Sequence, residues 1–174
     1  SGTPQSTQIN TAFGSPLQVT VKDGGGNPVG GVVVTFAAPG SGASGSFAGG
    51  VNTATTNASG VASSAAFTAN ATAGSYSVTA TAAGVSTPAS FSLTNTAGTA
   101  ASITATSGTP QSTQINTAFG SPLQVTVKDG GGNPVGGVVV TFAAPGTGAS
   151  GSFAGGVNTA TTNASGVASS AAFT

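Results

Sequence analysis

The sequence predicts an all-β protein that is built from tandem β-sandwich domains of about seven strands each. Short segments alternate between apolar and polar residues with a period of two, which is the pattern of half-buried strands. Clusters of Gly, Pro, Asn and Ser separate these segments, and no segment shows the periodicity of a helix. A long internal repeat sets the size of the folding unit.

Residues 107–174 copy residues 1–68 with a single difference, Ser41 in the first copy and Thr147 in the second. The offset of 106 residues is too long for the units of solenoids, but it suits one whole sandwich domain of roughly 100 residues. We therefore expect an immunoglobulin-sized domain over residues 1–96, whose leading strand is missing or supplied by a preceding repeat. A second, near-identical domain is expected over residues 97–174, truncated before its last two strands.

The well-patterned strands of the repeat supply the expected core. They are predicted over residues 17–22, 32–36, 61–67, 76–80 and 89–93. Their expected inward residues are Leu17, Val19, Val21, Val32, Val34, Phe36, Val61, Ala65, Phe67, Tyr76, Val78, Ala80, Ala89, Phe91 and Leu93. Val33 is expected to point outward. Because most of these residues are Val, Ala and Phe, the core is predicted to be thin.

The remaining segments are less regular. Residues 41–50 are predicted to form a loop or a short edge strand anchored by Phe47, and residues 51–56 a weak strand. Residues 57–60 are predicted to form a hairpin turn, in which Gly60 has a positive φ. Residues 92–99 are expected to link the domains, and residues 101–105 to form the leading strand of the second one.

Four motifs together resemble a known family. They are Val19-x-Val21-x-Asp23-x-x-Gly26-Asn27-Pro28-Val29-x-Gly31, Val34-x-Phe36, Thr56-Asn57-x-x-Gly60-Val61-Ala62 and Ala73-Gly74-x-Tyr76-x-Val78-x-Ala80. They resemble the bacterial immunoglobulin-like domains of group 1, which form the stalks of intimin- and invasin-type adhesins. Residues 107–174 carry the first three motifs again. The resemblance implies an immunoglobulin-like sandwich and an extracellular spacer role, although this chain has fewer charges than family members usually carry.

The last motif also resembles the Gly-x-Tyr-x-Cys of immunoglobulin sandwiches, with Val78 at the position of the Cys. In those sandwiches the tyrosine hydroxyl ties its strand to the preceding corner. The resemblance implies the same role for Tyr76.

Composition excludes several classes of function. The only charged side chains are Lys22, Asp23 and their copies Lys128 and Asp129, and there is no His. General acid and base catalysis and binding to nucleic acid both need more titratable or basic groups than these. No apolar run is long enough for a membrane-spanning helix. Without cysteine, the chain has neither disulfides nor thiolate metal sites.

The charged residues fit binding or cross-linking chemistry poorly. Lys22 could form an isopeptide bond with an Asn, but the strand pattern places Lys22 on the solvent-exposed face of its strand. Asp23-Gly24-Gly25-Gly26-Asn27 resembles a calcium loop, yet one carboxylate per repeat cannot supply the ligands that calcium needs. The glycines make a poor phosphate cradle because no helix follows them. We therefore expect no catalytic, cofactor-binding or metal-binding residues and no cofactor.

Two Thr-x-Thr segments, Thr53-Ala54-Thr55 and Thr79-Ala80-Thr81, offer an ice-binding or glycan-binding face. Alternate threonines are more often the polar side of an ordinary strand. Asn57, Asn70 and Asn163 each begin an N-glycosylation pattern.

The leading hypothesis is a non-enzymatic structural repeat of a bacterial surface stalk, extracellular or secreted, whose partners are neighbouring identical repeats. The first alternative is a self-assembling surface fibre or sheath subunit, completed by strand exchange between chains, because near-zero charge removes the repulsion that keeps chains apart. The second alternative is a glycan-binding module.

Overall fold

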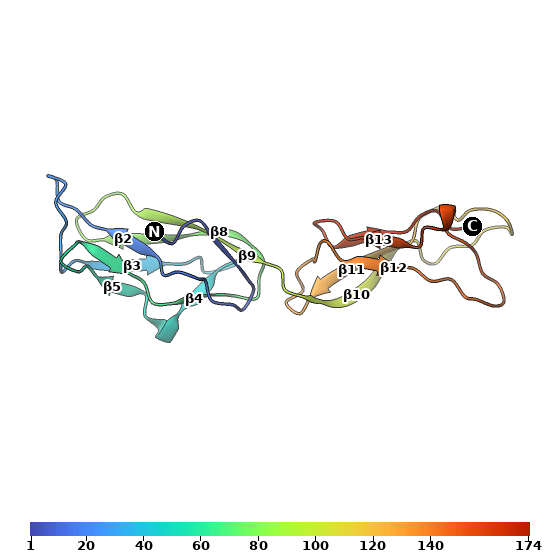
Figure 1. The fold of residues 1–174 in the computed structure, drawn as a ribbon, viewed down its shortest axis with the longest axis horizontal. Helices are drawn as coiled ribbons and strands as arrows, with labels where there is room; N and C mark the ends of the chain where they lie inside the picture. Colours follow the sequence, from blue (N-terminus) through green and yellow to red (C-terminus); the bar gives the residue numbers. More distant parts are fainter. The chain divides into compact units, whose positions relative to one another are not determined.

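The computed structural model describes all residues from 1 to 174, and the chain divides into two compact units, Ser1–Thr96 (unit 1) and Ala97–Thr174 (unit 2). Both units consist of strands, turns and one short 3₁₀ turn each, so the protein is all-β as predicted. In Figure 1 the strands of unit 1 run from blue to green, and those of unit 2 from yellow-green to red.

Unit 1 contains nine strands. They are β1 (Gln5–Gln8), β2 (Gln18–Thr20), β3 (Val33–Ala37), β4 (Gly45–Phe47), β5 (Thr53–Thr55), β6 (Val61–Ser63), β7 (Phe67–Ala69), β8 (Gly74–Ala82) and β9 (Ala89–Thr96), with the 3₁₀ turn η1 (Ala48–Gly50) after β4. One sheet has the order β1-β9-β8-β3-β5, and the ladders β2-β6 and β4-β7 form the rest of the sandwich. All the pairs are antiparallel except β1 with β9, which run parallel.

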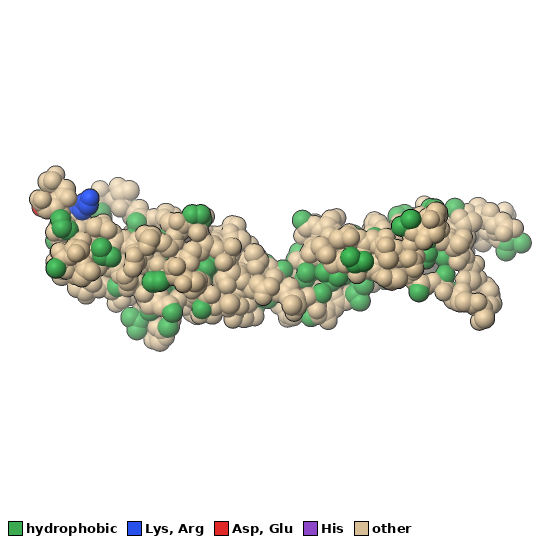
Figure 2. All heavy atoms as spheres, in the orientation of Figure 1, with side chains coloured by type: hydrophobic (Ala, Val, Ile, Leu, Met, Phe, Trp, Pro, Cys, Tyr) green, Lys and Arg blue, Asp and Glu red, His purple; other side chains and the backbone are tan.

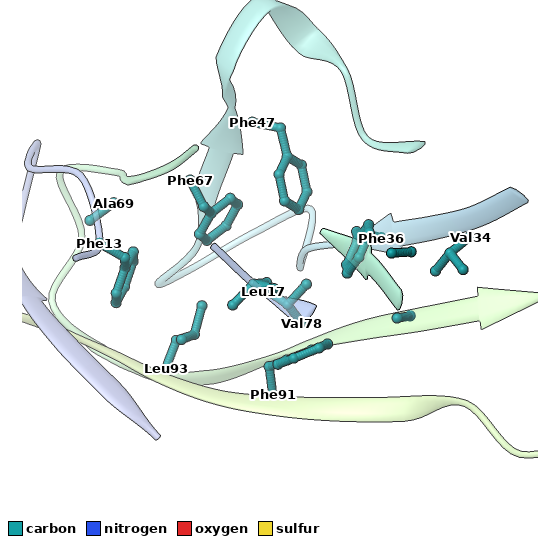
Figure 3. Close-up of a cluster of buried hydrophobic side chains, with 12 residues drawn as sticks. Phe13, Leu17, Val34, Phe36, Phe47, Phe67, Ala69, Val78, Phe91 and Leu93 are labelled. Carbon is teal, nitrogen blue, oxygen red and sulfur yellow. The ribbon is translucent and has the colours of Figure 1, made fainter. Parts of the chain in front are cut away.

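The core of unit 1 is one cluster of small aliphatic and aromatic side chains from both parts of the sandwich, and Figure 3 shows the labelled side chains pointing toward one another. Its buried members are Phe13, Leu17, Val34, Phe36, Phe47, Ala62, Phe67, Ala69, Val78, Ala80, Phe91 and Leu93. The alternation was therefore interpreted correctly in β3 and β8 and at Phe91 and Leu93 of β9, and Val33 is exposed as expected. Ala89, the first residue of β9, was predicted to point inward but is exposed.

The segment predicted as one strand over residues 61–67 is two strands, and its predicted inward phase is confirmed at Phe67 but wrong in the first part. Ala62 and Phe67 are buried, whereas Val61 and Ala65 are only partly buried. The chain leaves the β2 ladder after β6 and joins β4 through β7, and this change of partner shifts the phase by one residue.

The turn at residues 57–60 has the predicted positive φ at Gly60. It connects β5 and β6, which pair with different strands, so it is not the hairpin that was predicted.

Two other expectations also differ from the structure. Residues 92–96 belong to β9 rather than to a linker, because they pair with β8 on one side and β1 on the other. The strand β1 was not predicted, since Gln5–Gln8 carries no apolar residue.

Unit 2 contains β10 (Ala100–Ser107), β11 (Gln124–Asp129), β12 (Val139–Thr141), the 3₁₀ turn η2 (Ala154–Gly156), β13 (Thr159–Thr161) and β14 (Val167–Ser169). The strands form a sheet of order β10-β11-β14 and a ladder β12-β13. Its buried core is smaller and consists of Val127, Val140, Phe142 and Ala168.

Identical sequence is buried differently in the two units. Leu17 is fully buried in unit 1, but its copy Leu123 is only partly buried. Phe67 and its copy Phe173 differ in the same way. Unit 2 has no copies of β8 and β9, so the side chains that those strands cover in unit 1 remain more open.

Candidate functional site

The charged side chains do not gather into a reactive centre. Lys22 is exposed and follows the end of β2, away from the buried position that an isopeptide bond requires. No group of three or more His, Cys, Asp or Glu side chains lies together anywhere in the chain. No helix of the structure is long and apolar enough to cross a membrane. On the face shown in Figure 2, charged side chains are almost absent.

Asp23 stabilises the turn that the sequence predicts at this point. Its Oδ1 accepts hydrogen bonds from the backbone N–H groups of Asn27 at 2.8 Å and Gly25 at 2.9 Å. Bonds from the backbone and side chain of Asn27 lower the pKa of Asp23 below its ordinary value. The carboxylate is thus used within the turn, which agrees with a structural interpretation of the glycine-rich loop.

Asp129, the copy of Asp23, lies in a different environment. It is buried, and its Oδ2 accepts a hydrogen bond of 2.8 Å from the backbone N–H of Gly98, which immediately precedes β10. Burial raises the pKa of Asp129, but hydrogen bonds from Gly98, Asn133 and Gly131 outweigh this effect and the pKa is lowered. The contact with Gly98 is the difference between the two copies.

The threonines of the two Thr-x-Thr segments, residues 53–55 and 79–81, lie on the outer face of the five-stranded sheet, on either side of β3. Thr35 of β3 is the register partner of both Thr81 of β8 and Thr53 of β5. Farther along the face, the hydroxyls of Ser75 and Thr94 are 2.8 Å apart. The sequence therefore produces a hydroxyl-rich, uncharged face, as the polar side of alternating strands would.

A polar cluster that the sequence did not predict lies inside unit 1, around Asn95. The Asn95 side chain is 1 % exposed, and its Nδ2 donates to the carbonyl oxygens of Ser44 and Thr72 and to Oδ1 of Asn70. Its Oδ1 accepts a hydrogen bond from the Tyr76 hydroxyl at 3.0 Å.

Tyr76 therefore ties β8 to the side chain of Asn95 on β9, and the expected bond to the preceding corner is replaced by this one. The reason is the register, which places Tyr76 opposite Leu93 and only two residues from Asn95. Asn95 continues the inward phase of Phe91 and Leu93, and this alternation is the signal that could have identified it.

Strand β2 of unit 1 is shorter than its copy in unit 2. Residues 18–23 and 124–129 have the same sequence, Gln-Val-Thr-Val-Lys-Asp. In unit 2 they form the six-residue strand β11 between β10 and β14, whereas in unit 1 only three of them form β2, which pairs with β6 alone. Within residues 1–174, no strand pairs with β2 on the side where β10 pairs with β11.

An apolar cavity lies beside β2. It has a volume of about 140 Å³ and is lined by Val19 and Val21, by Val34 of β3, by Ala80 and Ala82 of β8 and by Val85, together with Thr20, Lys22, Thr81, Thr87 and Ala89. An apolar cavity of roughly 150 Å³ can bind a small apolar group. The cavity therefore has room for one small apolar side chain.

The matching place in unit 2 is a groove that contains such a side chain. Ile103 of β10 lines it together with Val127 and Val140, the copies of Val21 and Val34. Because unit 2 has no copy of Ala80 or Val85, one wall is absent and Ile103 remains 56 % exposed.

Comparison with known proteins gives similarity to two solved structures. No family model matches the chain, and no curated protein does. The chain is similar to invasin, a bacterial integrin-binding protein, with 24 % identity and a TM-score of 0.44, covering 99 % of this chain and 32 % of that one. It is also similar to domains 4–9 of the surface layer protein SbsC, with 19 % identity and a TM-score of 0.39, covering 97 % of this chain and 26 % of that one. The chain thus spans about a third and about a quarter of these proteins, and at such TM-scores neither likeness decides its function.

Proposed function

We propose that this chain is a structural repeat of an extracellular bacterial surface stalk or filament, in which each unit acts as a passive spacer. The observation that carries the proposal is that one 68-residue sequence occurs twice and keeps many of the same local contacts in both places, although strands such as β1 and β2 differ between the copies. For example, the Thr56 hydroxyl donates to the Val29 carbonyl at 2.7 Å, and its copy Thr162 donates to Val135 at 2.7 Å. A segment that keeps the same contacts in successive copies is suited to a stalk, because each added copy lengthens the stalk.

The geometry of β1 and β9 supports a mechanical role. They pair in parallel over four residues, from Gln5 opposite Leu93 to Gln8 opposite Thr96, and the Ile9 N–H donates to the Thr96 carbonyl at 3.0 Å. β1 lies near the start of unit 1 and β9 ends it. A force that pulls the two ends of the unit apart therefore shears all of these hydrogen bonds at once.

Single-molecule force spectroscopy on linked copies of the full chain tests the spacer proposal. Ile9→Pro removes the N–H that bonds Thr96, and we expect it to lower the unfolding force of unit 1. Ile115→Pro is the matched control, since Ile115 is the copy of Ile9, is 91 % exposed and lies where unit 2 has no copy of β9. Equal forces for the two variants and the parent would contradict the mechanical role of β1.

Labelling of intact source cells by an antibody against the chain tests the surface location.

A second function is favoured by the near-absence of charged side chains, which removes the repulsion that keeps chains apart. The chain would be the subunit of a surface fibre in which a strand from one chain completes the sandwich of another. The two functions differ in one measurement, the mass of the native assembly's denatured chains. Chains many repeats long favour the stalk, whereas chains near the 15.9 kDa of this sequence favour the fibre.

A further inference from the structure

The tripeptides that begin at Asn57, Asn70 and Asn163 match the pattern of an N-glycosylation acceptor, and the proposed function makes no use of them. In this modification a sugar is joined to Nδ2 of the asparagine. The nitrogen must therefore be accessible, and the fold must not need it for a hydrogen bond. The structure separates the three asparagines by this criterion.

Asn57 meets both conditions. It lies with Ala58 and Ser59 in the exposed turn between β5 and β6. Its Oδ1 accepts hydrogen bonds from the backbone N–H groups of Ser59 at 2.9 Å and Val61 at 3.1 Å, as asparagine does in many turns. Neither Nδ2 of Asn57 nor the Ser59 hydroxyl has a hydrogen bond within the chain. The turn thus holds the amide by its oxygen alone.

The backbone of this turn is held without help from Nδ2. The Asn57 N–H donates to the Val61 carbonyl at 3.0 Å, and the Gly60 N–H donates to the Asn57 carbonyl at 2.8 Å. On the neighbouring segment, the Gly31 N–H donates to the Thr56 carbonyl at 2.9 Å, and a Cβ added at Gly31 would meet nothing within 4 Å. A sugar on Nδ2 would therefore leave these bonds intact and find open space beside the turn.

Asn163, the copy of Asn57, has the same geometry in unit 2. Its Oδ1 accepts hydrogen bonds from the backbone N–H groups of Ser165 at 2.9 Å and Val167 at 3.1 Å. Residues 163–165 are exposed, as their copies are in unit 1. Because other parts of the two units differ, this agreement shows that the local sequence determines the arrangement of the turn.

Asn70 is held in the opposite way. Its Nδ2 donates to the Gly42 carbonyl at 2.8 Å. Its Oδ1 accepts hydrogen bonds from the backbone N–H groups of Ser44 and Thr72 and from Nδ2 of Asn95. A sugar on Nδ2 of Asn70 would crowd the loop at Gly42 and the polar cluster around Asn95. The folded chain therefore cannot use the pattern at residues 70–72.

We propose that Asn57 and Asn163 are sites of N-glycosylation and that Asn70 is not. The sugar comes from a donor in which a phosphate ester activates its anomeric carbon. Nδ2 forms a bond to that carbon, and the bond between the carbon and the phosphate oxygen breaks. The phosphate leaves with the bonding electrons, and one Nδ2 proton passes to a base of the transferase. The proposal goes beyond the spacer function and does not depend on it.

Peptide mapping of the chain isolated from its source cells tests the assignment. Chymotrypsin cleaves after aromatic residues, so it places the three asparagines in separate peptides, 48–67, 68–76 and 154–173. The first and third peptides have the same sequence. We expect that sequence to carry a sugar, which fragmentation places on the asparagine of Asn-Ala-Ser. Peptide 68–76, which contains Asn70, should keep its unmodified mass.

Two variants produced in the same cells are the controls. Ser59→Ala removes the hydroxyl of the pattern and leaves Asn57 in place, so the sugar at Asn57 should be lost. Asn57→Asp removes the acceptor nitrogen but keeps an oxygen for the turn, so it should lose the sugar and melt close to Ser59→Ala. Each substitution also changes the mass of peptide 48–67, so Asn163 can then be measured separately.

Three results would overturn the assignment. They are unmodified asparagine in all three peptides, a sugar on Asn70 in the folded chain, and a sugar on Asn57 that survives Ser59→Ala. None of these results bears on the spacer function, which the force measurement tests separately.

Discussion

The hydroxyl of Tyr76 on β8 donates a 3.0 Å hydrogen bond to Oδ1 of Asn95 on β9, and Asn95 is fully buried whereas Tyr76 is partly buried. The bond joins the only tyrosine of the chain to a buried amide that also holds two loops, through Ser44 and Thr72. This arrangement makes Tyr76 a spectroscopic reporter of unit 1 alone.

Tyr76 is expected to ionise late. Burial raises the pKa of Tyr76 from 10.0 to about 12, against a smaller opposing effect of its bond with Asn95. Because the folded pKa is above the unfolded one, the stability that the neutral hydroxyl contributes is complete below pH 10.0 and is lost as the pH rises toward about 12. Absorbance titration of the single tyrosine measures this directly. Titration at the ordinary value in the folded chain would contradict the buried position, and Tyr76→Phe should remove the alkaline dependence.

Replacing Asn95 should destabilise unit 1 strongly. Asn95→Leu removes the hydrogen bonds of this amide with the Ser44 and Thr72 carbonyls, with Asn70 Oδ1 and with the Tyr76 hydroxyl. The Ser44 carbonyl keeps the N–H of Asn70, so each lost bond should cost roughly 0.5–1.5 kcal/mol rather than the full penalty of an unpaired group. We expect a loss of roughly 2–6 kcal/mol in the free energy of unfolding, measured by denaturant with tyrosine fluorescence. Ser90→Ala, at an exposed position on the same strand, is the control and should change stability little. A small loss for Asn95→Leu would mean that water replaces the amide.

The sequence predicted the aliphatic and aromatic rows of unit 1 because period-two alternation survives wherever a strand keeps one partner. It failed where pairing depends on tertiary context. Residues 5–8 form β1 only beside β9, and the identical residues 111–114 form no strand in unit 2, where that neighbour has no copy. The length of β2 depends on its neighbours in the same way, so no pattern within Gln18–Asp23 could have predicted it.

Asn95 was missed for a different reason. Asparagine is a common turn residue, so its position just before a Thr-Ala-Gly segment was interpreted as a linker. The short length of β2 was not expected from the repeat, since its copy is the six-residue strand β11. The cavity beside it requires the spatial meeting of β2, β3 and β8.

Phe36 and its copy Phe142 form a matched pair for testing whether the units fold independently. Phe36 is fully buried and packs against Phe47 and Phe91. Phe36→Ala should cost roughly 3–5 kcal/mol in unit 1, as large aromatic deletions in cores do. Phe142→Ala should leave the fluorescence transition of Tyr76 unchanged, because Phe142 belongs to the core of unit 2. If Phe142→Ala shifts that transition as much, the two units unfold together.

A methyl group added at Gly45 is expected to disrupt the β4-β7 ladder through a steric clash. A Cβ at Gly45 would collide with the Thr68 carbonyl and come within 2.8 Å of the Phe67 ring, and neither can move away because both are held in the ladder and core. Gly45→Ala should therefore lower the melting temperature of unit 1, read from Tyr76, by several degrees. Gly24→Ala is the control, since a Cβ there meets nothing within 4 Å. Equal melting temperatures for the two variants would contradict the close approach of β4 and β7.

Acid should affect the two copies of the aspartate turn unequally, because only Asp129 has Gly98 as a partner. Hydrogen bonds outweigh burial and lower the pKa of Asp129, so its ionised form contributes stability above the ordinary value of 3.8, and this contribution is lost as the pH falls through the lowered folded pKa. Asp129→Asn should reduce this acid dependence in unit 2 and also lower its stability at neutral pH, because the charge-assisted bonds are weakened. Asp23→Asn is the matched variant at the exposed turn and should have the smaller effect at neutral pH.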